Sequence, residues 1–358
     1  MEKNVFEIEY AIRAYKTAVL ADGGVSADAT VFNTATVDDD AFENDGSIGV
    51  TTNVYGMQLL NQPNFDSGQM TVKQRKATGF AYWRGDTGFE FQQEKRAPTT
   101  TYEFDVTKQN LPLFLWLLFQ KGTSQGAVGT GYLKTCVPYG EGESDTEVCA
   151  VLLKKMSTTA ADSHVIGGAI VKSITLSCSE SAPVLKASVE LIGYNMVTDY
   201  DFNAGPNIIE YDSSTPLLWQ NASIKMAGQA VNLPGFTLTV TNNAVAKFYD
   251  NPHPVKYVLN TVEGTGSITV PWADTYAGSN EAIDNFIAGT DSLLQIWWGT
   301  ETPGADGDVK IEVNCRYTGA AVGGDDEVII ECPFDAVHDG TNNAIRIYAA
   351  DALDRSIT

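Results

Sequence analysis

The sequence predicts a mainly β protein with few helices (β+α), built from two similar β-sandwich or partial-barrel domains that each carry one packed helix. Three observations support this fold class. Short segments rich in β-branched residues alternate with turn formers, about one helical segment occurs in each half, and one motif occurs twice. A chain of 358 residues also exceeds the size of about 250–300 residues at which a single core usually divides.

The repeated motif is a strand, a glycine turn, a second strand and then Asn-x-Pro-x-Phe. It spans Val54–Phe65 in the first half and Met226–Phe236 in the second, where one residue fewer separates the glycine from the asparagine. The two motif asparagines, Asn61 and Asn232, lie 171 positions apart, which is near half of the chain. Because solenoid repeats have periods of roughly 20–50 residues, this spacing predicts a duplicated domain instead.

The helical segments correspond at a similar offset. Asn110–Phe119 is an apolar run that predicts a buried helix, and Asn280–Gly289 is its counterpart in the second half. Pro112 near the start of one segment and Gly289 at the end of the other are typical helix boundaries.

The later strands correspond as well, with a shorter spacing. Val171–Cys178 matches Val309–Cys315 at an offset that is about 33 residues smaller, so the first copy must contain an insertion. The Gly-rich segment at about 121–163 is the place where it fits. We therefore expect a first domain over 1–204, with an N-terminal arm and this insertion, and a second domain over 205–358.

Further strands are predicted where β-branched residues alternate with polar ones. These are Val189–Ile192, Thr237–Val240, Ser267–Val270 and Glu327–Ile330. Two segments are predicted to be loops: the acidic, aperiodic Thr36–Gly46, and Gly122–Gly131, which contains mostly Gly, Ser, Thr and Ala.

The net charge of −22 restricts the possible partners. Proteins that wrap nucleic acid need stripes of Lys and Arg that neutralise phosphates, and this composition argues against such a surface. It is compatible with a wall that encloses DNA without binding it, because an acidic wall repels phosphates. The alternative interpretation is that the acidic surface serves solubility alone.

Composition also indicates where the protein is made. Five cysteines, an odd number without a Cys-x-x-Cys pair, favour free thiols in a reducing cytosol over a disulfide framework. No signal peptide is predicted from the first residues, and no apolar run approaches the ~18 residues of a membrane span.

No catalytic, cofactor-binding or metal-binding residue is predicted. Gly122–Gly126 matches Gly-x-Ser-x-Gly, but the nucleophile elbow needs a preceding strand and a following helix, and here the helix comes first. The three histidines, His164, His253 and His338, are far apart in predicted loops and lack zinc-site spacing. The acidic runs at 38–40 and 325–327 lack the spacing of a calcium loop and are interpreted as solvated turns.

Several segments resemble the tail tube proteins (major tail proteins) of long-tailed bacteriophages. In that family a strand, a Gly hairpin and a second strand lead into an x-Leu-x-Val-x-Asn-Asn segment and a Gly-x-Gly-Ser-Ile-Thr-Val-like strand. The matching segments are Leu217–Val231, Phe236–Asn243, Gly264–Val270, Gly167–Ser177 and Val189–Gly193.

The resemblance implies a non-enzymatic structural virion protein with two tail-tube-type domains. Such proteins form stacked rings whose domains contribute strands to a continuous inner β-barrel, with a helix outside, and the bore is a channel for DNA ejection. The implied partners are further copies of the chain, other tail proteins and DNA that passes without specific binding; the implied location is the virion tail, assembled in the host cytoplasm. A duplicated domain favours a ring of three chains, with a hexamer as the second possibility.

Two other classes of protein are alternatives. A carbohydrate-binding β-protein of a virion or of a secreted kind would use exposed aromatic residues, for which the candidates are Trp83, Trp272, Trp297 and Trp298. The adjacent Trp297 and Trp298 must face opposite sides of a strand, so core packing or subunit contact explains them more simply. A hydrolase is disfavoured because no ordered nucleophile and base are present.

Two sets of site residues are predicted. Strand alternation makes Glu190 and Glu312 candidate lumen acids, each sharing its face with a lysine that offsets it in part. Apolar and aromatic residues in the two long loops are candidate contacts between rings; they are Phe42, Tyr132, Leu133, Val137 and Tyr139. We expect that a chain lacking residues 125–143 would still fold and would fail to extend into tubes.

Overall fold

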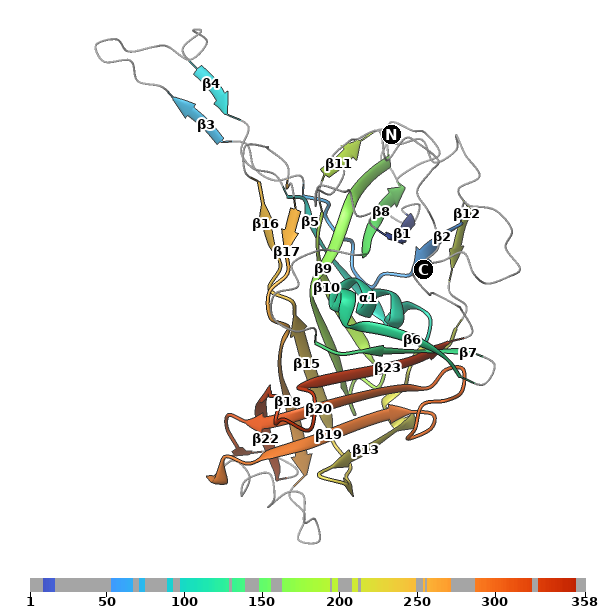
Figure 1. Cartoon of the computed structure of the whole chain (residues 1–358), viewed down its shortest axis with the longest axis vertical. Helices are drawn as coiled ribbons and strands as arrows, with labels where there is room; N and C mark the ends of the chain where they lie inside the picture. Colours follow the sequence, from blue (N-terminus) through green and yellow to red (C-terminus); the bar gives the residue numbers. More distant parts are fainter. Residues whose placement is uncertain are drawn as a thin grey trace.

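The computed structural model shows a β-rich molecule with the helix α1 (Asn110–Phe119) near its centre (Figure 1). The described residues are 9–16, 53–66, 71–74, 89–92, 97–128, 131–138, 148–155, 163–193, 195–198, 208–211, 214–248, 254, 256–271, 287–323 and 328–351.

One antiparallel sheet of six strands, here called sheet I, runs along the long axis of the molecule (Figure 1). Three of its strands come from the first half of the sequence and three from the second, and β9 pairs directly with β15 at the junction. The order across sheet I is β5 (Thr99–Asp105), β10 (Lys186–Ile192), β9 (Ser163–Ser179), β15 (Gly235–Thr241), β18 (Glu263–Pro271) and β22 (Ile329–Ala336).

A second antiparallel sheet, sheet II, crosses the lower part of sheet I in Figure 1. The last residues of β20 pair with β22 and thereby join the two sheets. Its order is β13 (Ala222–Met226), β19 (Asp291–Trp298), β20 (Val309–Tyr317), β23 (Ile345–Asp351), β7 (Gly131–Cys136) and β6 (Thr123–Val128), and β14 (Gln229–Ala230) forms a hairpin with β13.

The first residues of β9 belong to a third group of strands, sheet III. Because β9 has 17 residues, its N-terminal part pairs with β8 and β11 while its C-terminal part stays in sheet I. The order of sheet III is β12 (Ile208–Tyr211), β2 (Asn53–Met57), β1 (Glu9–Lys16), β8 (Val148–Lys155), β9 and β11 (Asn195–Thr198).

The remaining elements are short. Figure 1 shows β3 and β4 standing away from the body of the molecule. The full set of these short elements is β3 (Thr71–Gln74), β4 (Phe89–Gln92), β16 (Val245–Lys247), β17 (Lys256–Val258), β21 (Ala321–Gly323) and the 3-10 turns η3 (Gln120–Gly122) and η5 (Trp219–Asn221).

The core forms between sheets I and II and around α1 (Asn110–Phe119). Alternate residues of the strands face inward, such as Val189 of β10 and Ile311 of β20, and they belong to one cluster with the helix. All ten residues of α1 are buried, which confirms the prediction of a buried helix.

Both ends of α1 are buried, so their free backbone groups need partners. At the start, the Asn110 side chain accepts from the Thr107 N–H at 2.9 Å and the Thr107 hydroxyl accepts from the Asn110 N–H at 3.1 Å. At the end, the side chains of Gln120 and Asn242 donate to the carbonyls of Leu117 and Leu118 at 2.7 and 3.3 Å. These side chains fix where the helix begins and ends.

Several sequence predictions differ from the structure. The loop predicted for Gly122–Gly131 is wrong in its described part, because β6 lies there and pairs with β7. Gly56 lies inside β2 and not in a turn, so only the second motif copy has its glycine turn, at Ala227 and Gly228 with φ of 49° and 81°. His164 lies in β9 and not in a loop.

The predicted insertion at 121–163 contains β6, β7 and β8. Of these, β7 and β8 pair with strands outside the segment, β23 and β1, and β6 pairs with β7. Cys136 of β7 is fully buried in the core. Removal of residues 125–143 would delete β7. We therefore expect this deletion to impair folding, contrary to the expectation from the sequence that the shortened chain would still fold. The acidic segment 36–46 lies outside the described residues. Of the second predicted helix, residues 287 and 288 are helical and Gly289 ends them with φ 63°.

Asp308 organises the loop between β19 and β20. It is 4% exposed and accepts hydrogen bonds from the Thr300 hydroxyl and from the N–H groups of Thr300, Gly304 and Ala305 at 2.6–3.1 Å. Burial raises the pKa of this carboxyl, but the hydrogen bonds to Thr300, Gly304 and Ala305 together lower it more, and the pKa lies below its ordinary value.

Asp308→Asn is therefore expected to destabilise the protein at pH 7 by about 1–3 kcal/mol, because an amide cannot accept all four hydrogen bonds. A depressed folded-state pKa contributes stability above the unfolded value of about 3.9, and this contribution is lost as the pH falls through the folded value. Thermal unfolding of both proteins at pH 7 and pH 3 checks this. The gap between them should narrow at pH 3, and an equal gap at both pH values would contradict it.

Candidate channel wall

The outward face of sheet I, here called the polar face, is formed by every second residue of each strand. The strand registers place these residues opposite one another in rows that cross all six strands. One row runs Glu103, Ser188, Thr175, Thr239, Thr265 and Asp335, each residue opposite the next. Ser or Thr occupies most positions of β9, β15 and β18 on this face, and most of the intervening residues are buried. The sequence pattern thus makes one side of the sheet core and the other side a hydroxyl-rich surface.

The junction between the two halves lies inside the polar face. Thr175 of β9 and Thr239 of β15 are directly opposite, and their hydroxyls are hydrogen-bonded at 2.9 Å. Cross-strand threonine pairs stabilise antiparallel sheets. The polar face therefore continues without interruption from the first half into the second.

Carboxylates outnumber amines on this face. Among the described residues its acids are Glu103, Asp105, Glu190, Glu263, Glu331 and Asp335, and its bases are Lys172 and Lys186. Lys172 is paired with Glu190 at 2.8 Å, which also accepts from Ser173 at 3.3 Å. The described part of this face has an excess of negative charge and shows no basic stripe of the kind that binds phosphates.

The outward face of sheet II has a different charge. Glu312 lies there, where it accepts a hydrogen bond from Gln295 at 2.9 Å and forms an ion pair with Lys310 at 2.8 Å; Arg346 lies 3.9 Å away. Lys225 and Arg316 add positive charge to this face, and each is paired with a carboxylate. The two predicted lumen acids therefore lie on different faces: Glu190 on the polar face of sheet I and Glu312 on sheet II.

The predicted ring contacts do not form one surface in the described chain. Tyr132 and Leu133 are neighbours in β7 and face opposite sides of sheet II, and Val137 follows the strand; all three are half-buried. Phe42 and Tyr139 lie outside the described residues.

The tryptophan pair is not an exposed aromatic platform. Trp298 is 4% exposed and donates to the Leu218 carbonyl at 2.8 Å. Trp297 is 8% exposed and lies beneath the Lys225 amine, which is 5.5 Å from its ring centre. Trp83 and Trp272 lie outside the described residues.

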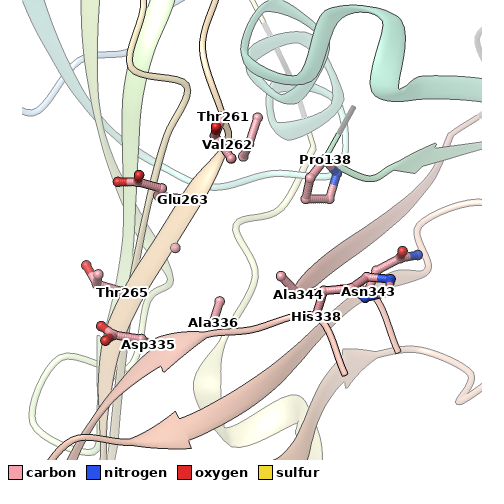
Figure 2. A pocket seen from close by; sticks show the side chains of 11 residues that line it. Pro138, Thr261, Val262, Glu263, Thr265, Asp335, Ala336, His338, Asn343 and Ala344 are labelled. Atoms are coloured by element: carbon pink, nitrogen blue, oxygen red, sulfur yellow. The ribbon is translucent and has the colours of Figure 1, made fainter. Parts of the chain in front are cut away.

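A cavity of about 700 Å³ lies behind the polar face, between the ends of β7, β18, β22 and β23. Figure 2 shows Glu263, Thr265 and Asp335 pointing away from the side on which Pro138, His338 and Asn343 gather. His338 accepts from the Gly340 N–H at 3.0 Å through Nδ1. The acids at its rim thus belong to the polar face, and the cavity does not bring an acid, a base and a nucleophile together.

The groups with catalytic or metal-binding potential are dispersed in the part of the chain that the structure describes. No group of three His, Cys, Asp or Glu residues able to hold a metal ion occurs there. Ser124 follows the η3 turn and lies in β6, not at a turn between a strand and a helix. Burial raises the pKa of the Cys136 and Cys178 thiols to about 12, so neither is a reactive thiolate at neutral pH.

The fold is mainly β, and its main surface feature among the described residues is the extended polar face of sheet I. The sequence model of a phage tail tube protein family matches residues 81–336, which is more than half of the chain. The chain therefore belongs to the phage tail tube protein family, whose members are structural components of the virion tail. A comparison with curated proteins gave no match. None of the helices in the described ranges has the length and apolarity to cross a membrane.

Sequence inspection missed the residues that explain two of the family-like segments. In the Asn-Asn segment, Asn242 is fully buried and joins β9, α1 and the following turn. In the Gly-x-Gly strand, a Cβ at Gly266 would lie 2.3 Å from the Thr237 oxygen and 2.5 Å from the Phe334 ring. An asparagine directly after an apolar, alternating strand is a signal that would have indicated such a buried polar link.

Proposed function

We propose that the chain assembles into stacked rings that form the tail tube, and that the polar face of sheet I lines the channel through which DNA passes. The observation that carries this proposal is the unbroken row from Glu103 to Asp335, which crosses both halves of the chain. Closing such sheets around a ring would also remove exposed strand edges, which otherwise pair without control.

The chemistry of the polar face suits a moving polyanion. Carboxylates repel phosphates, and Ser and Thr hydroxyls hold water without providing fixed positive charge. A wall of this composition supplies few places where DNA would bind, so the polymer slides. The opposite outward face, on sheet II, carries Lys225, Lys310, Arg316 and Arg346 and is less suited to this role.

The proposed ring contains three chains and has pseudo-sixfold symmetry. Sheet I supports this arrangement because each half of the chain contributes three strands to it. The boundary between the two domains is proposed to lie between residues 204 and 205. A hexamer in which one half builds the wall remains the second arrangement. Contacts between stacked rings are proposed for the segments around Phe42 and around Tyr132 to Tyr139, in the virion tail assembled in the host cytoplasm.

Electron microscopy of the purified protein, followed by reconstruction of the tube, tests the proposal. Rings or tubes of three chains, with sheet I around the bore and a net negative bore surface, are the expected result. Monodisperse single chains under conditions that favour assembly would overturn the function. Sheet II around the bore would overturn the assignment of the wall, and six whole chains per ring would overturn the trimer.

A further inference from the structure

The two halves of the chain use the same order of strand pairing. In the first half, β9 pairs along its N-terminal part with β8 and β11 and along its C-terminal part with β10, which in turn pairs with β5. In the second half, β20 pairs with β19 and β23, while its last residues and the following β21 pair with β22, which in turn pairs with β18. Thus β20 with β21 occupies the place of β9, and β22 the place of β10.

The junction between the halves uses one further strand, β15. It pairs with β18 of its own half along one edge and with the C-terminal part of β9 along the other, over Gly235 to Thr241 in both cases. This junction, here called the internal seam, joins the second half to the first within one chain.

The first half has a counterpart of β15 in residues 58–66, which follow the edge of β5. The Leu60 N–H donates to the Glu103 carbonyl at 2.7 Å, and bridges join Leu59 to Phe104 and Asp66 to Thr99. The Asn61 side chain extends this pairing by donating to the Thr101 carbonyl at 2.9 Å and accepting from the Glu103 N–H at 3.1 Å. The side chain of Leu60 is nevertheless 53% exposed.

The second half has a counterpart of the C-terminal part of β9 in β21, at the other end of sheet I. Within the described residues β21 pairs only with β22, and all three of its residues are exposed. Val322, at its centre, is 57% exposed. An exposed strand edge with a large apolar side chain is a typical site for the addition of another strand.

We propose that β21 of one chain pairs, antiparallel, with residues 58–66 of a second copy, so that the seam between chains repeats the internal seam between β9 and β15. This inference rests on the proposed ring and specifies which two edges meet in it. It explains why Leu60 and Val322, two of the large exposed apolar residues among the described ones, lie at opposite ends of sheet I. Pairing the two edges would cover Leu60 on the polar face, where it lies opposite Glu103, and Val322 on the other face, where it lies opposite the buried Ile330. Every junction in the wall would then have the same strand arrangement.

Cysteine cross-linking in the assembled protein tests this seam. Leu60→Cys and Ala321→Cys are introduced together, because Leu60 lies opposite Glu103 and Ala321 opposite Glu331, both on the polar face. After assembly the protein is treated with a short reagent that joins two thiols. Cys136, Cys178, Cys315 and Cys332 are buried, and Cys149→Ser in all variants removes the fifth thiol. We expect covalent dimers and larger products on a denaturing gel, ending at the number of chains in one ring.

Matched variants control the geometry. A Cβ placed on Gly235 would lie 3.8 Å from the Cβ of Ser179, within the range of about 3.5–4.5 Å that disulfides use. Ser179→Cys with Gly235→Cys should therefore form a bond inside one chain, with no increase in mass. Leu60→Cys alone and Ala321→Cys alone should give no ladder, because neither places two thiols at one seam.

Each outcome bears on a different statement. Tubes that form normally but give only single chains from the double variant would overturn the seam and leave the proposed function intact. A ladder from either single variant would also overturn it. Val322→Asp should leave the circular dichroism spectrum of the subunit unchanged and abolish ring closure, and normal rings from that variant would contradict the seam. If the unmodified chain forms no rings, the proposed function fails and the seam fails with it.

Discussion

Asn242→Ala is expected to lower the free energy of unfolding by about 2–4 kcal/mol, because it leaves several buried backbone groups without partners. The Asn242 amide donates to the carbonyls of Val171 and Leu118 at 2.6 and 3.3 Å, and its oxygen accepts from the Ala244 N–H at 3.1 Å. The residue is fully buried, so water cannot replace these bonds in the folded state. Denaturant unfolding followed by circular dichroism measures the loss.

Two further variants separate this effect from a general sensitivity of the segment. Asn242→Asp keeps the size of the side chain but removes the donor and places a carboxylate against two carbonyl oxygens, so it should be at least as destabilising at pH 7. Asn243→Gly removes an exposed hydrogen bond to the Thr261 carbonyl and keeps a backbone with φ 50°, which glycine adopts readily. It should change stability by less than about 1 kcal/mol. Equal losses from Asn242→Ala and Asn243→Gly would contradict the role of the buried amide.

Gly266→Ala is expected to cost about 3 kcal/mol or more, at the upper end of overpacking changes. A Cβ at this position would lie 2.3 Å from the Thr237 carbonyl oxygen of the neighbouring strand and 2.5 Å from the Phe334 ring. The ring can rotate, but the carbonyl oxygen belongs to the paired backbone of β15 and β18. The strands must therefore separate at the centre of sheet I, and the variant should melt at a markedly lower temperature.

Gly126→Ala is the matched control for this prediction. Gly126 also lies in a strand, β6, but a Cβ there would meet nothing within 4 Å. Alanine should be neutral or slightly stabilising at this position because it restricts the unfolded chain. A similar loss of stability from both substitutions would show that the close approach at Gly266 is not responsible.

Sequence periodicity predicted two kinds of element: the helix, whose hydrogen bonds are local, and strands with one apolar and one polar face. The apolar run Asn110–Phe119 is α1, and Val189–Ile192, Thr237–Val240 and Ser267–Val270 lie in β10, β15 and β18. In each of these strands a buried residue alternates with a polar one, so the side-chain pattern alone indicates the strand.

Elements formed through distant pairing were not predictable in the same way. Residues 123–128 contain Thr, Ser, Gln, Gly, Ala and Val, and nothing in that composition indicates a strand; their pairing with β7, which in turn pairs with β23, makes them one. Likewise, the polar alternation of Glu190 and Glu312 is the same in sequence, and only the tertiary arrangement assigns them to different sheets.

The internal seam has a consequence for the kinetics of assembly. β9 and β15 are covalently linked through residues 180–234, so this contact forms during folding and needs no diffusional encounter. In a ring of three such chains, only the contacts between chains would require collisions, each with an entropic cost of about 4–15 kcal/mol. By mass action, the rate at which complete rings nucleate would depend on roughly the third power of the subunit concentration instead of about the sixth. Rings would then start to form at low subunit concentrations, at which a chain of half the length would remain dispersed.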